Sequence, residues 1–100
     1  MSSTLKEKTE QTRLIEEQLK PVFPSVEAYR YNIASIRVRI IDERFEGRSK
    51  NERHEWVYSV LSDVPERIRR DITILLLLTP AEAKNSFMNL EYDDPSPSYL

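Results

Sequence analysis

The chemistry open to this chain is limited by its nucleophiles and metal ligands. The 100 residues contain no cysteine and a single histidine, His54. This imidazole is expected to titrate near neutral pH, but a metal site needs several ligands and a general base needs a reacting partner. No second histidine or acidic cluster is spaced to join it. We interpret His54 as a packing or capping residue and predict a non-enzymatic protein without metal or cofactor. In the alternative the protein is an enzyme, which would require a pocket built around His54.

The remaining candidate residues are basic and aromatic. Arg67, Arg69 and Arg70 form the densest basic cluster, which fits a solvated surface or, as an alternative, contact with nucleic-acid phosphates. Tyr29 and Tyr31 share one face of a predicted strand and are candidates for stacking on bases. Neither group decides between a protein partner and a nucleic acid.

Composition predicts one soluble globular domain. The chain is 39% hydrophobic and 32% charged, as in ordinary folded proteins, and its longest apolar run is too short to cross a bilayer. Residues 30–70 carry ten Lys or Arg against seven Asp or Glu, whereas the remainder carries five against ten. This asymmetry is too small for strong steering towards nucleic acid. No targeting signal is readable at the N-terminus, so we expect a cytoplasmic location without membrane contact.

The first half of the chain predicts a helix followed by a hairpin. Apolar residues at helical spacing indicate a helix that ends at Lys20, before Pro21. Apolar and polar residues alternate over residues 26–31 and again, more clearly, over residues 34–40, which predicts two strands in a tight antiparallel hairpin. Arg37 and Arg39 then lie on the solvent face of the second strand, as a solubilising surface or, alternatively, a binding surface.

The middle of the chain predicts two helices. Gly47 is the only glycine and precedes a helix over residues 50–61, where positive φ is often required. A capping box formed by Ser49 and Glu52 starts this helix, and Trp56 at its centre is expected in the core. A shorter helix begins at Pro65, so the pair resembles a helix–turn–helix.

The end of the chain predicts a strand and a last helix. Residues 72–78 are almost all apolar, which is typical of a central strand covered on one face and shielded at its ends or by a partner on the other. The Thr79-Pro80 start signal predicts a short helix with a buried stripe of Ala83, Phe87 and Leu90. The element order is α-β-β-α-α-β-α, an α+β fold in which helices pack on one face of a three-stranded mixed sheet and leave the other face open. We expect a flexible segment at 1–12, one domain at 13–90 and a mobile acidic tail at 91–100.

A motif around the strand–turn–helix junction carries a family resemblance. It comprises a Phe-Glu-Gly-Arg-Ser stretch, an Arg-His pair and a later Thr-Pro pair, in which the characteristic residues are Phe45, Gly47, Ser49, Arg53, His54, Thr79 and Pro80. In this pattern the chain resembles the BolA-like proteins over about residues 13–83. The resemblance implies a class II KH-like fold, with the Arg-His pair as part of the scaffold.

The resemblance also implies a partner and a cofactor, and the chain departs from both patterns. BolA-like proteins bind monothiol glutaredoxins and share a [2Fe-2S] cluster through a histidine before the last strand and a Cys or His in the hairpin loop. This chain has Asp71 at the position of that histidine, and its hairpin loop is reduced to about Asn32 and Ile33. Aspartate is a hard oxygen ligand and a poor replacement for imidazole at an iron–sulfur cluster. We therefore expect partner binding without cluster sharing.

Two functional hypotheses follow. In the first, the chain is a non-enzymatic BolA-like binding or regulatory module, of the kind the resemblance links to stress response. It docks a protein partner through the exposed sheet edge and Arg69, Arg70, Asp71 and Ile72, and it is a monomer or weak dimer. In the alternative it is a nucleic-acid-binding transcriptional regulator that uses Arg67, Arg69 and Arg70. The turn between its two helices lacks the Gly-x-x-Gly grip of KH domains.

Overall fold

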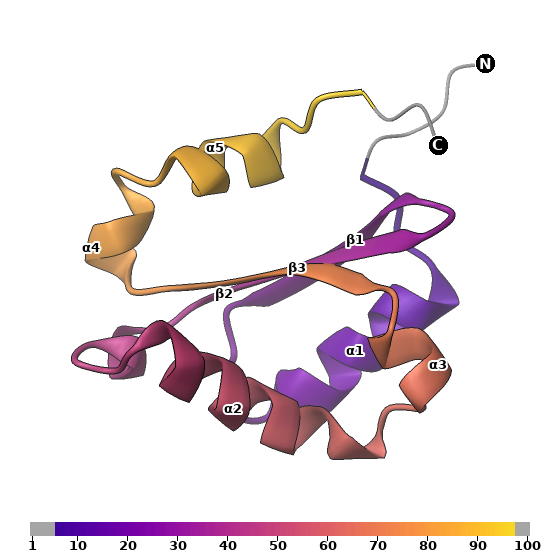
Figure 1. Cartoon of the computed structure of the whole chain (residues 1–100), viewed down its shortest axis with the longest axis horizontal. Helices are drawn as coiled ribbons and strands as arrows, with labels where there is room; N and C mark the ends of the chain where they lie inside the picture. The colour runs from indigo at the N-terminus through magenta and orange to yellow at the C-terminus, as the bar shows by residue number, and fades with distance from the viewer. Residues whose placement is uncertain (1–5, 98–100) are drawn as a thin grey trace.

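The predicted hairpin forms the first part of a three-stranded sheet. In the computed structural model, which describes residues 6–97, β1 (Val26–Asn32) and β2 (Ser35–Ile41) pair antiparallel, with the turn at Ile33 and Ala34. β3 (Ile72–Leu78) adds to β2 in parallel. Because parallel neighbours need a long crossover connection, the helices between β2 and β3 carry the chain across one face of the sheet (Figure 1). The mixed sheet and the α+β class are as predicted.

The position of β3 corrects the prediction of a central strand. The strand order is β1-β2-β3, so β2 is central and β3 lies at an edge. Leu75 and Leu77 share the face of the hydrophobic core, whereas Ile74 and Leu76 pair with the Arg37 and Arg39 positions on the opposite face. An apolar run indicates that both faces of a strand are covered. It does not indicate whether both edges of the strand are paired.

Three helices cover the first face of the sheet. These are α1 (Glu10–Leu19), α2 (Lys50–Val60) and α3 (Glu66–Arg69), with 3-10 turns at Glu43–Phe45 and Leu61–Asp63 (Figure 1). Their apolar sides and the inner face of the sheet enclose one core cluster. Its buried members are Ile15, Leu19, Phe23, Val26, Ala28, Ile36, Val38, Ile40, Phe45, Val57, Leu61, Val64, Ile68 and Leu77.

The helix start signals are confirmed. The Ser49 hydroxyl accepts from the Glu52 amide, and the Glu52 carboxylate accepts from the Ser49 amide at 2.7 Å. Gly47, just before this capping box, has φ +77°, the left-handed region that glycine adopts without steric cost. Trp56 is half-buried rather than fully in the core and packs against Phe23 with ring centroids 4.8 Å apart.

The C-terminal helices cover the second face of the sheet, which the sequence led us to expect open. α4 (Pro80–Ala83) turns the chain back and α5 (Phe87–Asp93) lies over the sheet on the side away from α1 and α2 (Figure 1). The predicted buried stripe was wrong, because Phe87 and Leu90 are 78% and 69% exposed. The sheet face below α5 carries arginines, so α5 turns its polar side and Tyr92 inwards.

The structure also moves the predicted domain boundaries outwards. Glu7 forms a β-bridge with Arg30, and α1 already begins at Glu10, both within the predicted 1–12 segment. At the other end, Tyr92 and Pro95 are buried within the predicted tail. The expectations for residues 1–5 and 98–100 lie outside the described residues.

Candidate functional site

The α3–β3 junction and the hairpin turn are joined by one ion pair. Arg30 on β1 donates from Nη2 to Asp71 Oδ2 at 3.0 Å. Its Nη1 also donates to the carbonyl oxygens of Asn32 and Ile33, at 3.2 Å each. A single guanidinium therefore fixes the turn against a residue 41 positions later in the chain. Three of the predicted partner-binding residues flank this pair, namely Arg69, Arg70 and Ile72.

The arginines of the predicted basic cluster are not equivalent. Arg69 is half-buried and donates from Nε to the Val64 carbonyl at 2.9 Å, so it holds the turn before α3. Arg67 and Arg70 are exposed. Arg67 also lines a small hollow of about 190 Å³ beside Asp71 and Arg30. With one arginine used as a structural donor and an acid beside another, the geometry does not favour the nucleic-acid alternative.

The predicted base-stacking tyrosines are used inside the fold, which corrects that expectation. Tyr29 is fully buried, and its hydroxyl donates to the Tyr92 carbonyl at 2.8 Å. Burial raises the pKa of Tyr29. Tyr31 is half-buried, its hydroxyl is hydrogen-bonded to Ser96, and the Arg37 guanidinium lies 3.7 Å from its ring centroid. Neither ring is free to accept a base.

Arg37 and Arg39 anchor α5 instead of facing solvent. Arg37 donates from Nη1 to Glu91 Oε1 at 2.8 Å, and Arg39 donates from Nη1 to Asp93 Oδ1 at 2.8 Å. The Arg39 guanidinium also lies 4.5 Å from the Tyr92 ring centroid. Both the solubilising and the binding interpretation of these arginines were therefore wrong. The alternation of acids at Glu91 and Asp93 was the sequence signal for this contact.

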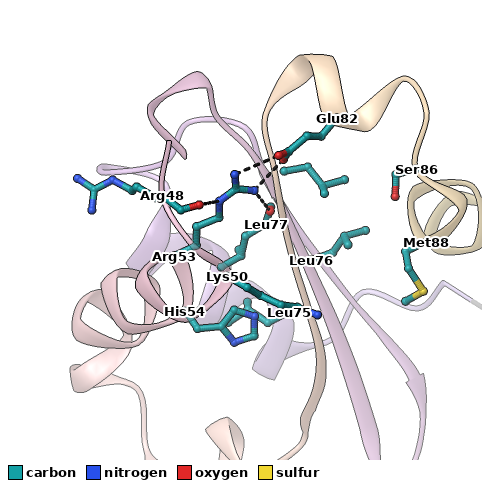
Figure 2. Close-up of a pocket in the computed structure, with 11 residues that line it drawn as sticks. Arg48, Lys50, Arg53, His54, Leu75, Leu76, Leu77, Glu82, Ser86 and Met88 are labelled. Atoms are coloured by element: carbon teal, nitrogen blue, oxygen red, sulfur yellow. Dashed lines mark hydrogen bonds and ion pairs between the residues drawn. The ribbon is translucent and has the colours of Figure 1, made fainter. Parts of the chain in front are cut away.

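The Arg53–His54 pair protects the outer edge of β3. Arg53 on α2 donates to the Leu77 carbonyl at 2.9 Å and forms a bidentate ion pair with Glu82 of α4, at 2.7 and 3.1 Å (Figure 2). His54, one residue later, lies beside Leu75 in the lining of the same edge (Figure 2). Backbone groups of alternate residues point to the same side of a strand, so Arg53 occupies the outward carbonyl of Leu77 and His54 lies beside the next outward position, Leu75. This arrangement agrees with a scaffold role for the pair.

The electrostatics of this region follow from those contacts. Two hydrogen bonds from Arg53, together with the Thr79 amide, lower the pKa of Glu82 to about 2. Partial burial lowers the pKa of His54, the nearby Lys50 cation lowers it further, and the Leu75 hydrogen bond opposes both effects. His54 is therefore mostly neutral at pH 7, whereas Glu82 is ionised.

A pocket opens beside this pair, between α2, β3 and the α4–α5 segment (Figure 2). Its volume is about 410 Å³. Sequence reasoning named two of its residues, Arg53 and His54, but not Lys50 or Met88, which approach from different elements. No periodicity within one segment links residues that the fold brings together across three elements.

Comparison with known proteins identifies the architecture. The fold is similar to that of BolA1 from Arabidopsis thaliana, at 21% identity and a TM-score of 0.55, over 75% of this chain and 98% of that chain. The BolA domain of SufE1 from Arabidopsis thaliana matches at 20% identity and 0.57, with the same coverage. BolA1 from Mus musculus matches at 21% and 0.57, over 100% of this chain and 86% of that chain. The chain has the BolA fold. No protein-family model and no curated sequence matches it.

The site residues do not fit the iron–sulfur cluster that the BolA resemblance implies. The resemblance led us to expect the ligand position at Asp71, and the carboxylate of Asp71 is paired with Arg30. The hairpin turn offers Ile33 and Ala34, neither of which has a ligand atom in its side chain. Over residues 6–97, no group of three or more His, Cys, Asp or Glu side chains is placed to hold a metal ion. The Arg30 guanidinium competes for the Asp71 carboxylate, and aspartate is a poor ligand for such a cluster.

None of the helices within residues 6–97 has the length and apolar character needed to cross a membrane.

Proposed function

We propose that this chain is a non-catalytic protein-binding module with a BolA fold, which docks a partner at the end of the sheet formed by the hairpin turn and Arg69–Ile72. The observation that carries the proposal is the Arg30–Asp71 ion pair, which joins these two segments into one surface. A preorganised surface binds more tightly because less freedom is lost on binding.

The surface has the composition of a small interface. Ile33 at the turn is 81% exposed and offers an apolar anchor, while Arg70, which precedes Asp71 in the chain, is exposed and charged. Buried apolar anchors and arginines account for much of the energy of protein interfaces. A BolA domain also occurs as one part of SufE1, which supports a role for this fold as a module that works together with other proteins.

We propose a monothiol glutaredoxin as the first partner to test, bound without sharing a cluster. The purified chain is titrated with apo and cluster-loaded glutaredoxin, with visible absorption, circular dichroism and size exclusion as readouts. We expect co-elution with both forms and an unchanged cluster spectrum. A changed spectrum would contradict binding without cluster sharing, and no co-elution with either form would remove glutaredoxin as the partner.

The docking surface is tested by matched substitutions. Ile33→Asp and Arg70→Glu are each expected to weaken binding by about tenfold, which corresponds to about 1.4 kcal/mol. Lys84→Glu is the control, because it replaces a cation by a carboxylate just as Arg70→Glu does. Lys84 is exposed and lies at the end of α4, beyond the opposite end of β3, so this substitution should leave the affinity unchanged. Equal binding by Ile33→Asp and the unmodified chain would place the interface elsewhere.

A further inference from the structure

The pocket beside the edge of β3 has the size of a small-molecule site. Its volume of about 410 Å³ lies within the usual range of about 300–1,000 Å³ for ligand pockets. At about 30 Å³ for a water-sized group, it has room for about a dozen heavy atoms. Its lining includes Leu77, Leu78 and Glu82 at the α4 end of β3, whereas the proposed docking surface belongs to the α3 end of that strand.

The floor of the pocket is apolar. Four consecutive leucines of β3, Leu75–Leu78, line it from one side and Met88 of α5 from the other (Figure 2). Three of these leucines are half-buried and Met88 is 44% exposed, so a ligand would remove further apolar surface from water. Removing apolar surface from water favours the complex. The thioether side chain of Met88 adapts to irregular ligand shapes.

The rim of the pocket is cationic. Arg53 is neutralised by Glu82, which is the one carboxylate in the lining. Arg48 lies over Trp56, with its guanidinium 4.5 Å from the ring centroid. Lys50 is exposed, forms no ion pair within residues 6–97, and extends beside His54 and Leu75 at the pocket wall (Figure 2). The balance of charge at the rim is therefore positive and complements an anion.

Addition of a partner strand fits this edge poorly. The carbonyl of Leu77 already accepts from Arg53, and the His54 side chain lies beside Leu75 at the same edge (Figure 2). An incoming strand would have to displace both side chains and break the Arg53–Glu82 pair. A ligand that needs no backbone hydrogen bonds can enter without these losses.

We propose that this pocket binds a small amphiphilic carboxylate, with its apolar chain on Leu76 and Met88 and its carboxylate at Lys50 and His54. The Nζ ammonium supplies the charge, and the imidazole can donate a second hydrogen bond when it is protonated. The proposal does not depend on the partner surface at the other end of β3. Either can fail without the other.

The only histidine of the chain gives a direct readout. A bound carboxylate favours the imidazolium, so binding raises the pKa of His54, and by linkage the affinity increases as the pH falls from 8 to 6. The probe is octanoate, followed by calorimetry and by NMR titration of His54. Octan-1-ol, which lacks the charge, and acetate, which lacks the chain, are the controls. We expect saturable binding of one octanoate, at least about tenfold tighter than either control.

Two substitutions test the placement. Lys50→Gln removes the cation and Met88→Glu puts a carboxylate at the apolar wall, and each should weaken octanoate binding by about tenfold. Lys84→Gln is the matched control, since this lysine is exposed and lies outside the pocket. Circular dichroism checks that each variant is folded. The proposal would be overturned if octan-1-ol or acetate bound as tightly as octanoate. It would also be overturned if the His54 NMR signal did not move at saturation with octanoate, a measurement that needs no variant.

Discussion

At the scale of single residues, Arg53 connects three elements. Its Nε donates to the Arg48 carbonyl at 3.0 Å, its Nη1 to the Leu77 carbonyl, and both Nη atoms to Glu82. The same Glu82 carboxylate accepts from the Thr79 amide and so completes the capping box of α4. Two short motifs that are far apart in the sequence, Arg-His and Thr-Pro, therefore meet at one ion pair.

The Glu82 carboxylate should make the stability of the chain depend on acidic pH. Its pKa in the folded state is about 2, below the value of about 4.3 in an unfolded chain. The contribution is complete above about pH 4.5 and is lost as the pH falls through the folded pKa. Glu82→Gln should lower the free energy of unfolding by at most about 1 kcal/mol at pH 7, because the carboxylate is half-exposed, and by clearly less at pH 2, where the folded-state carboxylate is partly protonated.

The measurement is urea unfolding of both proteins at several pH values. Glu55→Gln, an exposed glutamate of α2 outside the capping box, is the control and should follow the unmodified chain at every pH. A difference between Glu82→Gln and the unmodified chain that is as large at pH 2 as at pH 7 would contradict the assignment of the effect to ionised Glu82.

At the scale of elements, α5 shows the limit of reading apolar periodicity. The hairpin, α2 and β3 were predictable because alternation, capping boxes and an apolar run are local signals. The orientation of α5 was not, since Phe87 and Leu90 have the spacing of a buried stripe and yet face solvent. The sheet face that α5 covers is arginine-rich, so ion pairs and one aromatic residue select the buried side. The nearby acids Glu91 and Asp93 could have indicated this only together with a prediction of what lies opposite.

Tyr92 is the main anchor of α5. Two substitutions separate the contribution of its ring from that of its hydroxyl hydrogen bond. It is 1% exposed, and its hydroxyl donates to the Glu27 carbonyl at 2.8 Å. Burial raises its pKa above the usual range of tyrosine. We expect Tyr92→Phe to cost about 1 kcal/mol and Tyr92→Ala about 3 kcal/mol or more, because a cavity remains. Chemical unfolding gives both values.

The matched control for Tyr92→Ala is Tyr58→Ala, at a partly exposed position on α2. It should cost much less than the buried substitution. Equal costs for the two alanine variants would mean that α5 contributes no more than a surface residue, contrary to its burial against the sheet.

At the scale of the whole molecule, both faces of the sheet are covered within one chain. The sequence led us to expect an open second face and a monomer or weak dimer. The structure provides α5 for the face and the Arg53–His54 pair for the edge, which removes the physical reason for a dimer through the sheet. The radius of gyration, 13.3 Å, is that of a compact chain of this length, about 13 Å.

We therefore expect a monomer. Light scattering coupled to size exclusion should give a mass near 11.8 kDa at micromolar concentration. A stable dimer would contradict this expectation. If a dimer formed, the exposed residues Phe87 and Leu90 of α5 would be its first candidates, and replacing both by glutamate would show whether they carry it.

Gly47 has a consequence for the handedness of the backbone. Among residues 6–97 it alone takes a positive φ, and a Cβ added there would meet no atom within 4 Å. Space is therefore no obstacle to an L side chain at this position, and only the chirality of the residue opposes one. Within residues 6–97, the junction before α2 is thus the single point where the backbone adopts the mirror image of its ordinary conformation. An amino acid of the opposite hand would favour this conformation instead of resisting it.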